Sequence, residues 1–262
     1  MNGLEPRRDE KQEDLAGLVF YSLLAGATAL IPIPLLDDWC YGVVRRRMAR
    51  EIFRRRGIES RRTELRVVLG EYDPDRIGGC LYKVFFTLVI VPLRILSRVA
   101  RDIVRKVLIF LAVKQASDWA SAVFHEGYLL RRGAERLPPG DRLGKTDARR
   151  IRFAVRLALR GLNTSPIWNV FYGIIRMNRS LLRSVAARLA RIGKPSRERH
   201  RQETEDPEVD EYLRQERRLL EDVINRLADA LAGQRGYLNQ LERRFEQYYR
   251  DGGAGAAHRN GY

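Results

Sequence analysis

Few side chains in this sequence have the chemistry of a catalytic or metal centre. The histidines are His125, His200 and His258, and no spacing of histidine and cysteine matches a zinc site. His125 stands directly before Glu126, but adjacent residues of a helix face different directions, and the second histidine of a metalloprotease helix is missing. A structural or capping role is therefore the better interpretation of this pair.

The remaining candidate groups also favour structural roles. Asp37 and Asp38 have carboxylates that could bind a cation, although capping of a helix explains them more simply. No phosphate-binding loop, dinucleotide fingerprint or nucleophile elbow occurs. Cys40 and Cys80 are too few for a disulfide framework, which indicates a reducing compartment. The sequence therefore predicts no catalytic residues, no metal site, no cofactor and no enzyme activity.

Charge is the strongest chemical signal in the chain. The 262 residues contain 49 Lys and Arg against 33 Asp and Glu, which gives a net charge of +16. Residues 201–262 hold 10 basic and 13 acidic side chains, so residues 1–200 carry a net charge of +19. A basic body of this kind binds polyanions, either nucleic acid or the anionic leaflet of a membrane.

An uncharged stretch from Leu15 to Leu36 favours the membrane. Its 22 residues would rise about 33 Å as one helix, which matches a hydrocarbon core of roughly 30 Å. Pro32 and Pro34 end the helix near Leu30, which leaves about 24 Å and predicts a shallow or re-entrant insertion. The alternative is a buried helix and turn in a protein core. The candidates for insertion are Leu15, Val19, Phe20, Leu23, Leu24, Leu30, Ile31, Pro32, Ile33 and Pro34.

Two basic amphipathic helices are predicted after this stretch. The first begins at Asp37 or Asp38 and stops at Gly57, with apolar residues at every fourth position and arginines on the other faces. The second runs from about Leu93 past Gln115, with arginines beside its apolar stripe. These charged faces either contact anionic lipid or are solvated faces of a bundle. The candidates for anionic-lipid contact are Arg45, Arg46, Arg47, Arg50, Arg54, Arg55, Arg94, Arg98, Arg101 and Arg105.

Residues 22–57 resemble a known module. Small apolar residues are followed by the sequence IPIP at 31–34, then by aspartate, and then by a basic helix that ends in Arg-Gly at 56–57. This order is similar to the helical membrane domain of unknown function in YcjF-type inner-membrane proteins and after some Era-like GTPase domains, and to a lesser extent to EcsC-type proteins. The resemblance implies a helical fold and membrane association. It carries over no catalytic residues, and the chain has no GTPase motifs.

Turn and composition signals divide the chain. Within the basic part, helices are expected at 148–159 and from Ser165 to about Ile192, with Thr164 or Ser165 as N-cap and Pro166 in the first turn. The predicted divisions are a charged tail at 1–14, a basic helical membrane-associated domain at 15–192 with a break near 71–82 and a loop at 133–147, a linker at 193–208, a helical or coiled-coil segment at 209–250 and a disordered tail at 251–262.

Residues 209–250 repeat apolar side chains at heptad spacing. Gln234 interrupts the main heptad position, and Glu216 and Arg244 break its companion. Gly233 would allow a turn, so the segment is either one coiled-coil helix or a hairpin of two helices. Both forms predict a partner helix, in the same chain, in a second copy or in another protein. The candidates for self-association are Leu213, Leu220, Leu227, Leu241 and Tyr248.

These patterns together predict an all-α protein, a membrane-associated helical bundle with a C-terminal amphipathic helix or helical hairpin. Because no secretory signal is visible, the expected location is the cytoplasmic side of the inner membrane. The favoured function is non-enzymatic binding of anionic membrane surfaces as a scaffold or adaptor. One alternative is a soluble interaction scaffold whose apolar segments are core. The other is a nucleic-acid-binding bundle, which net charge alone supports because aromatic side chains are not interleaved with the arginines.

Overall fold

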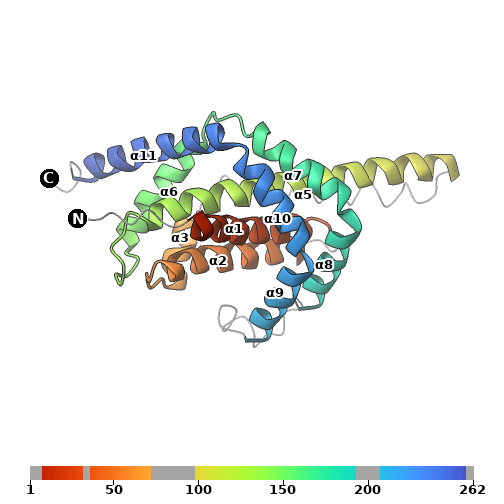
Figure 1. Cartoon of the computed structure of the whole chain (residues 1–262), viewed down its shortest axis with the longest axis horizontal. Coiled ribbons are helices and arrows are strands. Elements are labelled where there is room, and N and C mark those ends of the chain that lie inside the picture. Colours follow the sequence, from red (N-terminus) through yellow and green to blue (C-terminus); the bar gives the residue numbers. More distant parts are fainter. Residues whose placement is uncertain (1–7, 32–35, 72–97, 193–206, 258–262) are drawn as a thin grey trace.

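The described residues, which are 8–31, 36–71, 98–192 and 207–257 of the computed structural model, form helices joined by loops (Figure 1). This part of the chain forms ten helices and no strand, so the predicted all-α class is confirmed. None of these helices combines the length and the low charge that crossing a bilayer requires. The helices are α1 (Arg8–Thr28), α2 (Leu36–Arg55), α3 (Arg62–Val68), α5 (Arg98–Ala134), α6 (Lys145–Leu159), α7 (Ser165–Met177), α8 (Arg179–Ile192), α9 (Pro207–Leu219), α10 (Glu221–Ala232) and α11 (Arg235–Ala257).

The uncharged N-terminal stretch forms the central helix of the bundle. α1 packs against α2, α5, α8 and α10, and every residue from Ser22 to Thr28 is buried. The two hydroxyl side chains in this run donate hydrogen bonds of 2.7 Å to carbonyl oxygens of the same helix. A β-carbon at Gly26 would lie 2.8 Å from the Ala116 carbonyl oxygen, so glycine allows α1 and α5 to approach closely.

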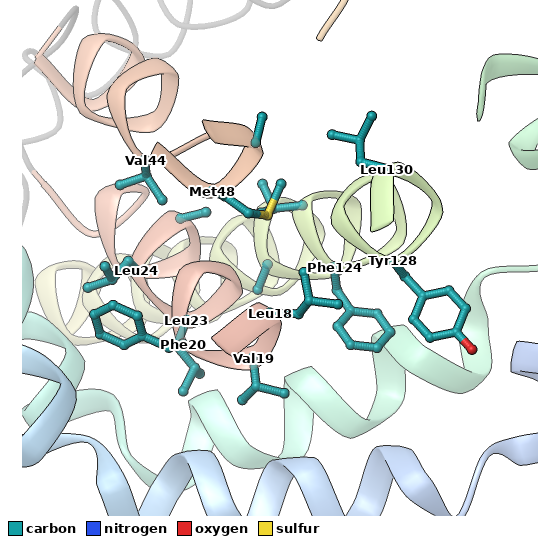
Figure 2. Close-up of a cluster of buried hydrophobic side chains, with 14 of the residues drawn as sticks. Leu18, Val19, Phe20, Leu23, Leu24, Val44, Met48, Phe124, Tyr128 and Leu130 are labelled. Carbon is teal, nitrogen blue, oxygen red and sulfur yellow. The ribbon is translucent and has the colours of Figure 1, made fainter. Parts of the chain in front are cut away.

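The insertion candidates in α1 lie inside the protein rather than at its surface. Figure 2 shows four of them, Val19, Phe20, Leu23 and Leu24, in a cluster of buried hydrophobic side chains that includes residues of α2 and α5. A fully buried aliphatic or aromatic side chain contributes about 1.5–3 kcal/mol, so withdrawing α1 into a bilayer would dismantle this core. The alternative interpretation, a buried core helix, therefore describes α1. Val19, Phe20, Leu23, Leu24 and Ile31 are buried, Leu15 and Leu30 are partly buried against the same core, and Pro32, Ile33 and Pro34 lie outside the described residues.

The two helices after the predicted N-cap at 163–166 differ from the prediction in detail. Thr164 occupies the N-cap position, as one of the two predicted residues, but its side chain makes no capping hydrogen bond, and Asn163 Oδ1 instead accepts the Ser165 backbone N–H at 3.0 Å. The single helix expected up to Ile192 is broken between α7 and α8. At this break the Asn178 side chain donates to the Ile174 carbonyl oxygen at 2.9 Å, a local hydrogen bond that competes with helix continuation.

The C-terminal segment forms three helices rather than one coiled coil or a hairpin of two. α10 packs on α1 and α7, and α11 packs on α6 and α5, so the partner of the heptad stripe is the same chain. The self-association candidates are consequently part of the core. Leu220, Leu227 and Leu241 are fully buried, and Leu213 and Tyr248 are partly buried.

Both residues that break the companion heptad position form polar contacts. Glu216 is buried and accepts hydrogen bonds from Arg188 of α8 at 2.6 and 2.9 Å. Arg244 donates to the carbonyl oxygens of Ala158 and Arg160, at 3.0 and 2.6 Å, at the C-terminal end of α6. Positively charged side chains that donate hydrogen bonds to the unpaired carbonyl oxygens at a helix C-terminus are favourable. Glu216 thus attaches α9 to α8, and Arg244 attaches α11 to α6.

A buried ion pair joins α2 to α5. Arg45 donates from Nε at 2.7 Å and from Nη2 at 2.5 Å to the carboxylate of Glu126, and Nη2 also donates to the Leu69 carbonyl oxygen at 2.9 Å. The two side chains are only 2% and 7% exposed. Arg152 of α6 donates to the same carboxylate at 3.4 Å. Burial lowers the pKa of Arg45, but the charge of Glu126, its hydrogen bond and the charges of Tyr41 and Glu71 together raise the pKa by more, so the guanidinium stays charged.

Removing the charge of this carboxylate should destabilise the fold strongly. Glu126→Gln keeps the side-chain shape but leaves the Arg45 cation buried without its counter-charge, so we expect a loss of about 3–5 kcal/mol in the free energy of unfolding. Urea denaturation followed by circular dichroism measures the loss. Glu51→Gln is the control, because Glu51 pairs with Arg54 and Arg55, which are 74% and 33% exposed, and the substitution should cost about 1 kcal/mol or less. Equal losses in the two variants would contradict a central role for the buried pair.

A buried histidine joins α5 to α11. His125 Nδ1 lies 2.6 Å from the Ser121 carbonyl oxygen, and Nε2 lies 2.6 Å from the Tyr237 hydroxyl. This arrangement fits a neutral ring that donates from Nδ1 and accepts at Nε2. Burial lowers the pKa of His125 to about 4, although its hydrogen bond to Ser121 acts in the opposite direction. The structural role predicted for His125 thus corresponds to helix docking.

The stability of the protein should fall in acid because of this histidine. The unfolded chain binds a proton below the ordinary pKa of 6.5, whereas the folded ring stays neutral until about 4. The free energy of unfolding therefore falls by about 3 kcal/mol as the pH is lowered from 6.5 to about 4. Urea unfolding of the wild type and His125→Gln across this range measures the effect. The stability difference between the two should shrink as the pH falls, and a constant difference would contradict it.

Candidate anion-binding site

Arginines of α2 line a hollow of about 1020 Å³. Its walls come from α1, from the C-terminal half of α2 and the loop that follows, and from α9. Its apolar lining includes Leu18, Met48 and Ile52, so it combines an apolar floor with polar walls, as ligand pockets do. Ten arginines and three carboxylates line it: Arg47, Arg50, Arg54, Arg55, Arg56, Arg61, Arg131, Arg142, Arg214 and Arg217, with Asp14, Glu51 and Glu59.

Two loops with paired backbones build one edge of the hollow. Residues 57–59 and 140–143 exchange three backbone hydrogen bonds of 2.8 to 3.2 Å. Gly57 and Gly140 make this pairing possible because their φ angles, 69° and 81°, lie in the left-handed region that favours glycine. The pairing brings Arg61 and Arg142, which are distant in sequence, to the same hollow.

Two carboxylates neutralise part of the arginine cluster. Glu51 accepts from Arg54 at 2.7 Å and from Arg55 at 2.9 Å. Asp14 of α1 lies 3.2 Å from Arg55 and 3.8 Å from Arg131 of α5. These pairs hold the arginines of α2 in place, and each carboxylate is shared between two guanidinium groups.

Carboxylates outside the lining pair with three more of these arginines, since Glu135 lies 2.8 Å from Arg56 and 3.8 Å from Arg131, and Glu211 lies 3.0 Å from Arg214. Within the described part of the chain, Arg61, Arg142 and Arg217 have no carboxylate within ion-pair distance. Ten arginines against three carboxylates give the lining a formal charge of +7. Like charges gathered around one cavity repel each other, and a bound anion relieves that repulsion. The geometry therefore suits a ligand that carries several negative charges.

The arginines expected to contact lipid separate into three groups. Arg45 and Arg46 are directed to carboxylates, since Arg45 pairs with Glu126 and Arg46 with Glu71 at 3.0 Å. Arg45 is buried and cannot reach a membrane, which corrects its assignment as a lipid contact. Arg47, Arg50, Arg54 and Arg55 line the hollow, Arg94 lies outside the described residues, and the side chains of Arg98, Arg101 and Arg105 lie outside the described part of α5.

Sequence reasoning missed the arginines that come from other segments. Arg131, Arg142 and Arg217 belong to α5, to the loop before α6 and to α9, and no spacing in the sequence connects them. The available signal was the excess of basic residues in the first 200 positions, which indicates an anionic partner but not a location.

Cys40 and His125, two of the groups first considered for chemistry, are buried and do not line this hollow. Cys40 is buried, and burial together with the charge of Asp37 raises the pKa of its thiol to about 12, so the thiol stays protonated. His125 is occupied by its hydrogen bonds to α11 and to its own helix. Among the described residues, no group of three or more His, Cys, Asp or Glu side chains is placed to hold a metal ion.

Comparison with known proteins identifies no relative. No protein-family model, curated protein or solved structure matches the chain. The resemblance of residues 22–57 to the YcjF-type helical domain stays a prediction. Function is therefore inferred from the charge and geometry of the hollow.

Proposed function

We propose that this is a non-enzymatic binding protein whose arginine-lined hollow holds an anion with several phosphate groups. The observation that carries the proposal is the excess of positive charge around the hollow, because ten arginines and three carboxylates line it and a formal charge of +5 is left when the outside partners Glu135 and Glu211 are included. The guanidinium group presents its N–H donors in a planar fork that matches two phosphate oxygens. The volume of about 1020 Å³ is at the upper end of the range for small-molecule pockets.

The positions of the unneutralised arginines favour more than one phosphate. Arg61 follows α2, Arg142 precedes α6 and Arg217 lies in α9, so they approach the hollow from three segments. A single phosphate offers few oxygens and at most two charges, whereas an oligophosphate can contact several guanidinium groups at once. Each charge-assisted contact of this kind contributes about 1.5–3 kcal/mol.

Two sources supply this chemistry. One is a soluble oligophosphate, and the other is an anionic phospholipid headgroup, which would place the protein on a membrane surface as a scaffold or adaptor. Both require the same arginines, because the recognised group is phosphate in each case.

Calorimetric titration of the full chain at low salt tests the proposal. We expect affinity to rise from orthophosphate through pyrophosphate to triphosphate, and to fall steeply between 50 and 200 mM salt if several contacts form, as for other phosphate-binding sites. The variant R61Q/R142Q/R217Q should bind triphosphate at least about tenfold more weakly, which corresponds to about 1.4 kcal/mol.

The matched control removes three exposed arginines outside the hollow. R149Q/R176Q/R183Q lowers the net charge equally, and its affinity for triphosphate should stay within about twofold of the wild type because the hollow is intact. A short-chain, water-soluble cardiolipin supplies the lipid arm: tighter binding than triphosphate assigns a headgroup, and weaker binding assigns a soluble oligophosphate. The proposal is overturned if neither probe binds, or if the two triple variants lose equal affinity.

A further inference from the structure

The N-terminal part of α5 extends beyond the helices that pack on the rest of it (Figure 1). No described side chain from Val107 to Ala112 is buried, and burial in α5 begins at Val113. Residues 98–112 would rise about 22 Å as a regular helix. One end of α5 therefore reaches away from the core that holds its other end.

Two large apolar side chains are exposed on this end. Val107 is 50% exposed and Phe110 is 54% exposed, and their separation of three positions places them on one face of the helix. The other large exposed apolar side chains in the described part of the chain, Phe153, Met177 and Leu219, lie singly on three different helices. Since burying a large apolar side chain contributes about 1.5–3 kcal/mol, exposing two side by side is unfavourable without a partner.

The charge of the same segment indicates what the partner is. Residues 98–112 contain four basic residues and one acidic residue, a net charge of +3. At 3.6 residues per turn, positions 98, 101 and 105 fall roughly 120–180° around the helix from Val107. An apolar face opposite a basic face is the pattern of a helix that lies in the interface of an anionic membrane.

We infer that the projecting end of α5 docks on an anionic lipid surface, with Val107 and Phe110 entering the boundary between headgroups and acyl chains. Basic residues near such a surface contribute about 1 kcal/mol each, and the two apolar side chains add their burial. A second copy is a poorer partner, because two segments of net charge +3 would repel each other. This inference does not rest on the phosphate ligand proposed for the hollow.

Co-flotation of the full chain with vesicles tests the inference. The wild type should float with vesicles of phosphatidylcholine and phosphatidylglycerol and should stay behind with phosphatidylcholine alone, because the attraction needs anionic lipid. V107D/F110D should reduce the ratio of bound to free protein at least about tenfold. M177D/L219D is the matched control, since it alters two exposed apolar side chains on α7 and α9 and should float like the wild type.

Three results would overturn the inference. The first is equal flotation of V107D/F110D and the wild type, or no flotation of the wild type. The second is a dimer, seen by light scattering, that V107D/F110D abolishes while vesicles bind neither protein, because a second copy then covers the face. The third is a fall of more than about 5 °C in the melting temperature of V107D/F110D, which would show that its own chain buries the face. Triphosphate titration of V107D/F110D should match the wild type, so failure here is distinguishable from failure at the hollow.

Discussion

The structure depends on one buried carboxylate. Glu126 of α5 accepts both donors of the Arg45 fork from α2 and a third hydrogen bond from Arg152 of α6. Arg45 also donates to the Leu69 carbonyl oxygen just after α3, so four segments meet at this group. Taking two charges out of water is costly and is tolerated only when the geometry satisfies both ions. The pair therefore specifies the register of α2 against α5 more than it adds stability.

This register determines where the remaining arginines of α2 face. At 3.6 residues per turn, Arg47, Arg50 and Arg54 fall roughly 140–200° around the helix from Arg45. With Arg45 directed to Glu126, these three are directed to the opposite side, where they line the hollow. A structural ion pair on one face of α2 thus positions the binding surface on its other face. Because α2 is held rigidly, little entropy is lost when a ligand orders these side chains.

Much of the helical architecture could be predicted because its signals are local. The prolines after residue 31, the aspartates at the start of α2 and the left-handed Gly57 mark boundaries within a few residues of the observed ones. The environment of α1 could not be predicted in the same way, since an uncharged helix suits a bilayer and a protein interior equally. Only the packing of α5, α8 and α10 around it decides between the two. Glu216 and Arg244 show the same limit, because a charged residue in an apolar stripe looks like an error until its distant partner is known.

The position of the hollow could not be predicted from the sequence for a related reason. Its lining comes from α1, α2, α5, α9 and two loops, and the contact that joins those loops depends on two glycines 83 positions apart, Gly57 and Gly140. What the sequence contained was the total charge, and the structure concentrates part of that charge around one cavity. Two like charges about 8 Å apart repel by about 0.5 kcal/mol even in water, so a cluster with three unneutralised arginines is unfavourable in the empty protein. The apolar core around α1 supplies the stability that keeps this cluster assembled, and the Glu126 ion pair fixes the register of α2 that positions it. Like charges that a fold holds close together are typical of a functional site. There a bound ligand of opposite charge, rather than a group of the protein, relieves the repulsion.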